Sequence, residues 1–313
     1  MIEKYISRLM ETTPSTFLNT NTLHLDVVVE GGAFNGSYLV GVLYFLKELE
    51  RKGRIKIHRF SACSVSTICS ILYMIERLDL FENIYRQGLD IFKRDGRLDV
   101  LTTVFDIIRQ VSDENLYMRL NNRLYMTYYD VKNCRHVVKC KYKSNDHLFE
   151  CISRSAHIPF VIDANIARHG RYIDGQQPYF FKEKRNASAD NGRKMLCISL
   201  VTYSNINTIT STINVKNENN NVHRVLSGTL DAHTFFMTGI PTQMCCFKHN
   251  MPMTINIQNK VKQLLLVFIG YLISIIIYAT QYIGDDMLKT FIVKVFRVTS
   301  EDIYKTFIQH YCV

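Results

Sequence analysis

Two consecutive strand–turn–helix units near the N-terminus constrain the fold of this chain more than any other feature. The apolar run 25–29 (LDVVV) leads into a glycine-rich turn at 30–36, and an amphipathic helix is predicted to follow. A strand is then expected at 55–60, a turn of small residues at 61–66 and an apolar helix at 67–75. Short β-rich runs that alternate with helices are typical of a parallel sheet with right-handed crossovers. We therefore expect an α/β fold.

The rest of the chain continues this alternation of helices and strands. Residues 80–126 have amphipathic spacing and are predicted to be mostly helical, and a second helix is predicted at 146–156. Other segments are rich in residues that favour strands, and these segments are 133–142, 162–167, 171–173 and 195–203. The sheet is therefore expected to gain strands well beyond the first two units.

Composition indicates a globular domain with additional chain. Of the 313 residues 47% are apolar and 21% are charged, which excludes a wholly disordered chain. We expect an N-terminal segment at 1–22, an α/β domain at 23–205 and a C-terminal region at 206–313. The first segment mixes charged and apolar residues, so no secretory signal peptide is expected there. Nine irregularly spaced cysteines favour reduced thiols over a disulfide framework.

The positive charge of the chain points to an anionic partner. There are 38 Lys and Arg against 28 Asp and Glu, which gives a formal charge of +10. Nucleic acid and acidic lipid headgroups are the two usual partners of such a surplus. No basic–aromatic motif or nucleic-acid fold signature is present, so we expect no nucleic acid.

The turn at 31–36 (GGAFNG) has the composition of an anion-binding site. Glycine has no Cβ, so its N–H groups can approach a ligand closely, and the N-terminus of the following helix favours negative charge. No Gly-Lys-Ser/Thr follows, and the G-x-G-x-x-G spacing is absent, so neither a P-loop nor a dinucleotide site is indicated. The alternative is an ordinary tight turn between a strand and a helix.

Ser64 stands between the second strand and its helix, with small residues two positions away on each side. This arrangement suits a nucleophile elbow, in which small flanks let strand and helix pack while the serine takes a strained, exposed conformation. Ala62 and Ser66 occupy the positions where the usual G-x-S-x-G pattern has glycine. The alternative is a serine that caps an ordinary helix.

Asp174 follows a short predicted strand and precedes Gly175. A carboxylate near Ser64 can accept the hydroxyl proton and act as a general base. The alternative is an Asp-Gly pair that simply forms a turn.

The three features in this order resemble the patatin-like phospholipases. The resemblance covers roughly residues 23–205. Residues 31–36 resemble the oxyanion loop of that family, and the next seven residues (SYLVGVL) resemble its continuation. Residues 153–160 (SRSAHIPF) are similar to the small-residue helix that ends in proline, and 171–175 (RYIDG) to the turn that carries the catalytic aspartate.

The resemblance implies a three-layer α/β/α fold with a mostly parallel central sheet and the activity of a lipid acyl hydrolase. The enzyme would be of phospholipase A type, a lysophospholipase or a triacylglycerol hydrolase, with Ser64 as nucleophile, Asp174 as general base, and no cofactor or metal. The implied oxyanion hole consists of Gly31, Gly32, Ala33, Asn35 and Gly36. The implied elbow consists of Ala62, Cys63, Val65 and Ser66, and the implied dyad turn of Gly175 and Gln176.

Several positions depart from the family pattern. Ala33 replaces the third glycine of the loop, Asn35 replaces its basic residue, and Gln176 follows the Asp-Gly pair. Loss of one oxyanion donor costs roughly 3–4 kcal/mol of transition-state stabilisation. The alternative function is a catalytically impaired patatin-like protein that acts as a lipid-binding or membrane-associated module. A rival catalytic arrangement is a Ser–Asp–His triad that uses His223 or His233.

The segment 264–283 carries no charged residue and has about the length that crosses a bilayer. Lys260 and Lys262 precede it, and two aspartates follow it. We expect contact with a membrane, either as a single span or as a helix on the lipid surface. The alternative is a helix that is fully buried within the C-terminal region. The expected location is therefore cytoplasmic and membrane-associated, with a phospholipid or neutral lipid as substrate and no obligatory protein partner.

Overall fold

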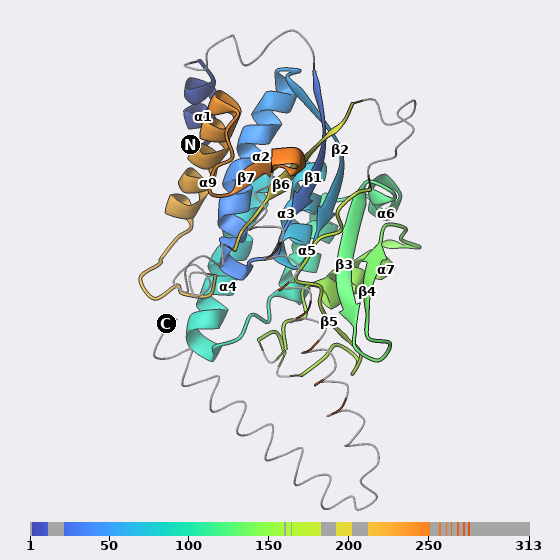
Figure 1. Cartoon of the computed structure of the whole chain (residues 1–313). Helices are drawn as coiled ribbons and strands as arrows, with labels where there is room; N and C mark the ends of the chain where they lie inside the picture. The colour runs from blue at the N-terminus through green and yellow to red at the C-terminus, as the bar shows by residue number, and fades with distance from the viewer. Residues whose placement is uncertain are drawn as a thin grey trace, which may run out of the picture.

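A mostly parallel sheet of seven strands forms the centre of the molecule, and helices flank it (Figure 1). The computed structural model describes residues 2–11, 22–159, 161–163, 165–182, 192–201 and 212–250, together with the single positions 257, 261, 264, 268, 272 and 275. The expectation of an α/β fold with a mostly parallel sheet is confirmed, and the architecture is compatible with three layers.

The two N-terminal strand–turn–helix units form as the sequence predicts. Strand β1 (Leu23–Val29) leads through the short 3-10 turn η1 (Ala33–Asn35) into helix α2 (Gly36–Arg51). Strand β2 (Ile55–Ala62) pairs in parallel with β1 and leads into helix α3 (Val65–Met74). The carboxyl ends of both strands therefore lie at the same edge of the sheet.

The remaining strands extend the sheet on both sides of β1 and β2, in the order β4-β3-β2-β1-β6-β7. Four neighbouring strands, β3, β2, β1 and β6, are parallel, whereas β4, β5 and β7 pair antiparallel. The added strands are β3 (Leu124–Asp130), β4 (Arg135–Lys139), β5 (Tyr172–Asp174), β6 (Lys194–Ile198) and β7 (Cys245–Phe247). The chain runs from β1 to β2 on one side and returns as β6 on the other, and such a reversal is where open α/β sheets bind ligands.

Strands β2 and β5 share one edge of β3, because β4 occupies the other edge. Ala62 at the end of β2 pairs with Met126, and Asp174 at the end of β5 pairs with Tyr128. The two strands run in opposite directions, so their carboxyl ends point toward each other along β3. This arrangement brings the turn after β2 next to Asp174.

The main apolar core lies between one face of the sheet and the helices. Val27 and Val29 of β1 belong to this core, whereas Val28 packs on the opposite face with Phe181 and Cys197. This alternation follows from the two-residue period of a strand. Other helices of the structure are α1 (Ile2–Glu11), α4 (Phe81–Asp95), α5 (Leu101–Val111), α6 (Leu116–Leu120) and α7 (Asn145–Ser155), and short 3-10 turns are η2 (Leu78–Leu80) and η3 (Lys248–Asn250).

Helix α9 (Val222–Thr238) packs on α2 through two glycines. A Cβ added at Gly41 would lie 2.0 Å from the carbonyl oxygen of Val225, and one added at Gly228 would lie 1.9 Å from that of Tyr38. The two backbones therefore approach closely, and the Thr229 hydroxyl donates to the Gly41 carbonyl at 3.1 Å. Residues after 205 thus contribute both a core helix and the edge strand β7 to the same α/β body.

Two predicted elements differ from the structure. The helical prediction for 80–126 holds for α4, α5 and α6, but residues 124–126 open the strand β3. Apolar side chains at 120 and 124 have helical spacing, but the run Leu124–Asp130 is rich in β-favouring Tyr and Thr and is almost fully buried. The prediction of a strand at 162–167 is wrong for its described residues, which form turns and bends.

Most of the apolar segment 264–283 lies outside the described residues. Its described positions, 264, 268, 272 and 275, are helical. Among the helices that the structure describes, none combines the length and hydropathy that a bilayer crossing requires.

Candidate functional site

Ser64 has the backbone conformation of a strained elbow. Its φ is +56° and its ψ is −138°, a region that residues with a side chain rarely occupy. The Ser64 N–H donates to the Ser155 hydroxyl oxygen at 3.1 Å, and the Ser155 hydroxyl donates to the Thr127 carbonyl at 2.8 Å. Ser155 therefore ties the elbow to β3 from the end of helix α7.

Asp174 lies against Ser64 and is held in place by the backbone around it. The Ser64 side chain lies beside its carboxylate, and the Gln176 N–H donates to Oδ1 at 2.7 Å. The Asp174 N–H donates to the His157 carbonyl at 2.8 Å. Burial raises the pKa of Asp174 to about 6, although the neighbouring Ser64 hydroxyl and the Gln176 N–H favour the charged form. A carboxylate with this pKa is ionised at neutral pH and basic enough to accept a proton.

The Asp-Gly turn requires its glycine. A Cβ at Gly175 would lie 2.7 Å from the carbonyl carbon and oxygen of Thr127, so a side chain there would push the turn away from β3. The His136 ring lies 3.2 Å from the Gly175 carbonyl. Gln176 has a positive φ of 53° and contributes its N–H, rather than its side chain, to the position of Asp174.

The glycine-rich loop packs directly on the elbow. A Cβ at Gly31 would lie 2.9 Å from the Ser64 Cβ, and one at Gly32 would lie 2.7 Å from the Leu200 Cβ. Ala33 keeps the loop conformation with a φ of +42° despite its side chain. Among the described residues, the N–H groups of Gly32 and Ala33 donate to no protein acceptor. These two groups border the cavity that contains Ser64, so they are available to stabilise an oxyanion.

The resemblance implies that Asn35 and Gly36 belong to the oxyanion hole, but the structure gives both residues other contacts. The Asn35 N–H donates to the Gly32 carbonyl at 2.8 Å, and its side-chain amide donates to the Leu200 carbonyl at 2.8 Å. The backbone N–H and one side-chain N–H are thus used inside the protein. Gly36 allows close packing, because a Cβ there would lie 2.6 Å from Val65 Cγ2.

The other elbow residues hold the turn together. Ala62 and Cys63 are completely buried, and the Ser66 hydroxyl donates to the Glu30 carbonyl, which joins the elbow to the start of the loop. Burial raises the pKa of Cys63 well above its usual value, and the nearby Asp174 carboxylate adds to this effect. The thiol therefore stays protonated, and Ser64 is the nucleophile that the geometry favours.

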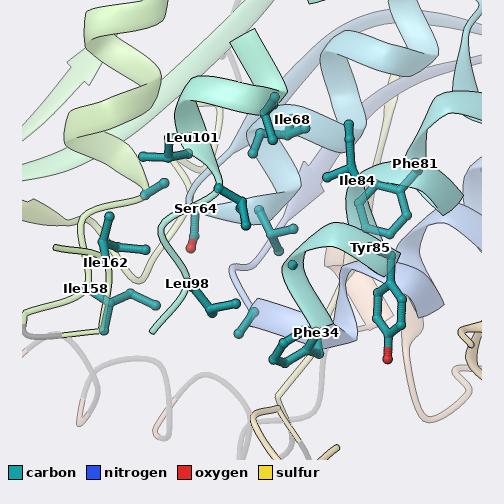
Figure 2. A pocket seen from close by; sticks show the side chains of 16 residues that line it. Phe34, Ser64, Ile68, Phe81, Ile84, Tyr85, Leu98, Leu101, Ile158 and Ile162 are labelled. Carbon is teal, nitrogen blue, oxygen red and sulfur yellow. The ribbon is translucent and has the colours of Figure 1, made fainter. Parts of the chain in front are cut away.

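Two cavities meet at Ser64, and they differ in polarity. One has a volume of about 80 Å³ and runs between α3, α4 and α5 (Figure 2). Its lining is almost entirely apolar and includes Phe34, Ile68, Ile84, Leu98, Leu101 and Ile162. The other has a volume of about 380 Å³ and is bordered by Glu30, the loop glycines, Asp174, Gln176 and Thr212. Ala33, Ser64 and Ile158 line both cavities, so the hydroxyl stands at their junction.

The histidines of the rival triad lie elsewhere. The His223 side chain is 55% exposed and lies 3.4 Å from Glu218, and His233 packs edge-on against Phe45. His157 is buried, and its ring contacts the Asn165 carbonyl at 3.2 Å. None of the three lines a cavity that contains Ser64, so the geometry favours a dyad over a triad.

Two residues with structural links to the site were not identified from the sequence. Ser155 belongs to the small-residue helix that resembles the family, so its motif was visible but its bond to the elbow was not. Arg224 of α9 is buried and donates to the Asn35 side chain across 189 residues of sequence. No local pattern around Arg224 indicates this contact.

The described residues contain no group of three or more His, Cys, Asp or Glu that could hold a metal ion. All eight cysteines within the described part of the chain are free thiols. No protein-family model matches the sequence, and no curated protein matches it either.

Proposed function

We propose that this protein is a serine hydrolase that cleaves carboxylic esters of lipids through a Ser64–Asp174 dyad. The observation that carries the proposal is the position of Ser64, in a strained turn, beside a buried carboxylate and open to an apolar cavity. An ordinary helix cap does not need the strained φ, and Ser64 makes no side-chain cap in α3.

The reaction follows from the positions of the groups. Asp174 accepts the proton of Ser64 as the Oγ attacks the ester carbonyl carbon, and the carbonyl oxygen becomes an oxyanion. The N–H groups of Gly32 and Ala33 donate to that oxyanion. Collapse of the tetrahedral intermediate breaks the bond to the alcohol, which leaves with the proton from Asp174. Asp174 then takes a proton from water as the hydroxide adds to the acyl carbonyl carbon. Collapse of this second intermediate breaks the bond to the Ser64 Oγ, which takes the proton from Asp174, and the carboxylic acid leaves.

The two cavities support a lipid ester as the substrate class. The apolar cavity, at about 80 Å³, suits the first methylene groups of the acyl chain, because burial of each contributes about 0.8 kcal/mol. The larger and more polar cavity suits the alcohol side of the ester, a glycerol backbone with or without a headgroup. We infer a phospholipase A, lysophospholipase or triacylglycerol hydrolase activity from this division, on a patatin-like three-layer α/β/α domain.

The described C-terminal positions support contact with a lipid surface. Six of them are apolar, helical and exposed by 44–69% of their surface: Ile257, Val261, Leu264, Phe268, Leu272 and Ile275. Together with the formal charge of +10, these exposed apolar side chains favour an anionic membrane surface.

An impaired, lipid-binding relative is the second candidate function, and Asn35 is the observation that favours it. The loop has no basic side chain, and Asn35 uses its backbone N–H and one side-chain N–H within the protein. Such a protein would bind the acyl chain in the apolar cavity without turnover.

Fatty-acid release from phospholipid vesicles and from triacylglycerol emulsions separates the two functions. We expect release by the wild-type protein and a loss of at least about 1,000-fold in Ser64→Ala, because removal of the nucleophile of a dyad removes the covalent step. Ser227→Ala is the matched control, since Ser227 is an exposed serine of α9. Equal release by wild type and Ser64→Ala would contradict the enzyme and leave the lipid-binding module.

A further inference from the structure

Arg224 joins three segments next to the glycine-rich loop. Its side chain is 3% exposed, and one guanidinium nitrogen donates to the Asn35 side-chain oxygen. Another donates to the Asn214 carbonyl at 3.0 Å, and Nε donates to the Glu218 carboxylate at 3.0 Å. A planar guanidinium can hold several acceptors in fixed directions, which a lysine ammonium cannot do in the same way.

Asn35 transmits this restraint to the peptide that precedes Ala33. Its side-chain amide is fixed at both ends, by Arg224 and by the Leu200 carbonyl. Its backbone N–H donates to the Gly32 carbonyl. The carbonyl of Gly32 and the N–H of Ala33 belong to one planar trans peptide, in which they point in opposite directions. The bond from Asn35 therefore turns the Ala33 N–H away from Asn35.

We infer that Arg224 is a positioning residue for the oxyanion hole, which it aligns through Asn35. The inference rests on the proposed function, because it concerns the donor that would bind the oxyanion. Arg224 touches neither cavity that contains Ser64, so it acts on the reaction only through the loop.

The effect of Arg224 is geometric rather than electrostatic. Glu218 neutralises its charge, and the Tyr85 hydroxyl donates to the same carboxylate. Lys93 Nζ donates to the Glu218 backbone carbonyl at 2.6 Å. The Tyr85 ring lines the apolar cavity while its hydroxyl points away from Ser64 (Figure 2). One buried network thus connects the loop with the wall of that cavity.

Arg224→Lys tests the inference, because it keeps the positive charge beside Glu218 and removes the planar fork. We expect kcat for ester hydrolysis to fall by about 10-fold or more, since a displaced donor weakens only the transition state, and KM to stay within about 2-fold. Lys93→Met is the matched control, because it removes a cation from the same network without a bond to the loop, and it should keep the wild-type kcat.

A double-variant cycle distinguishes positioning from a general loss of stability. Asn35→Leu should lower kcat as Arg224→Lys does, and the double variant should be no slower than the slower single variant, because both act along one path. Should Arg224→Lys fold poorly, the charge-neutral pair Arg224→Met with Glu218→Gln serves instead. Additive losses in the cycle, or an unchanged kcat in Arg224→Lys, would overturn the inference.

A single-turnover probe separates this inference from the proposed function. In an alkyl fluorophosphonate, the Ser64 Oγ attacks phosphorus, fluoride leaves, Asp174 takes the proton, and the phosphoryl oxygen occupies the oxyanion hole. We expect Arg224→Lys to slow this labelling in parallel with kcat. If the wild type neither hydrolyses lipid esters nor reacts with the probe, both proposals fail. If the wild type does both and Arg224→Lys equals it, only the role of Arg224 is refuted.

Discussion

The two turns that meet at the candidate site have similar strand–turn–helix frameworks, but one requires the absence of side chains and the other retains one. Each joins a parallel strand to a helix at the same edge of the sheet, and they touch at Gly31 and Ser64. The first turn depends on missing side chains, because a Cβ at Gly31 or Gly32 would overlap its neighbours. The second turn keeps its side chain in a conformation that glycine would adopt more easily. The comparison indicates that one turn presents backbone N–H groups and the other presents a hydroxyl.

Among substitutions that leave the dyad in place, the largest effect is expected from a side chain in the first turn. In Gly31→Ala the new Cβ would lie 2.9 Å from the Ser64 Cβ, so one of the two turns must move. Displacement of an oxyanion donor lowers kcat by about 100- to 1,000-fold. Initial rates of fatty-acid release by the purified variant measure this change.

Gly53→Asn is the matched control for that substitution. Gly53 has a φ of +69°, which asparagine tolerates, and no atom lies within 4 Å of the position of an added Cβ. It should keep the wild-type rate. A Gly31→Ala variant as active as Gly53→Asn would show that the contact between the two turns does not matter for catalysis.

The second prediction concerns the carboxylate that both turns face. Burial raises the pKa of Asp174 to about 6 from its ordinary value of 3.8, so the folded state binds a proton more tightly than the unfolded state. The ionised Asp174 therefore destabilises the folded state. This loss of free energy of unfolding is absent below about pH 4, grows between about pH 4 and 6, and reaches its full value, on the order of 3 kcal/mol, above about pH 6. Asp174→Asn should therefore raise the free energy of unfolding at pH 8 and leave it nearly unchanged at pH 3.5, as urea denaturation measures.

The same pKa predicts the pH dependence of the reaction. Asp174 must be ionised to accept the Ser64 proton, so kcat/KM should rise with pH through a midpoint near the pKa of about 6. Asp174→Asn should abolish turnover across the whole range, although it is the more stable protein at pH 8. An Asp174→Asn variant less stable than wild type at pH 8 would mean that its hydrogen bonds outweigh its burial.

The sequence alone predicts the two turns well, because each requires local residue types. Gly31, Ser64 and their strands follow from composition and spacing within short segments. The contact of Asp174 with Ser64 depends instead on the pairing of β5 with β3, which only the folded sheet determines. Asn35 was expected to face the oxyanion, but Arg224 and Leu200 bind its side chain from distant segments. Long-range contacts of single side chains leave no pattern in the sequence.

The third prediction concerns Ser155, which lies outside the second turn and binds its backbone. Ser155→Ala removes the hydroxyl whose oxygen accepts from the Ser64 N–H and whose O–H donates to the Thr127 carbonyl. The Ser64 N–H and the Thr127 carbonyl therefore each lose this hydrogen bond. We expect a loss of about 2 kcal/mol in the free energy of unfolding. The kcat should also fall, because the strained φ of Ser64 loses its support.

Ser70→Ala is the control for Ser155→Ala. Ser70 is a buried serine of α3 whose hydroxyl donates to the Ser66 carbonyl within the same helix. We expect it to cost less than about 1 kcal/mol and to leave kcat unchanged. If both variants lose stability equally and keep kcat, Ser155 acts as an ordinary core residue.

The smallest expected effect is a gain in the free energy of unfolding when glycine relieves the backbone strain in the two turns. Ser64 and Ala33 are non-glycine residues at positive φ, so glycine at either position relieves backbone strain. Ser64→Gly and Ser64→Ala both lack the nucleophile, and their difference isolates the backbone. We expect Ser64→Gly to be more stable by about 1 kcal/mol, because the relief exceeds the extra chain entropy of glycine. Ala33→Gly should stabilise by a similar amount while it keeps activity, since the donor is a backbone N–H. Equal stability of the two Ser64 variants would mean that the surrounding contacts, rather than stored strain, define the elbow, and the two turns would then differ less than their backbones suggest.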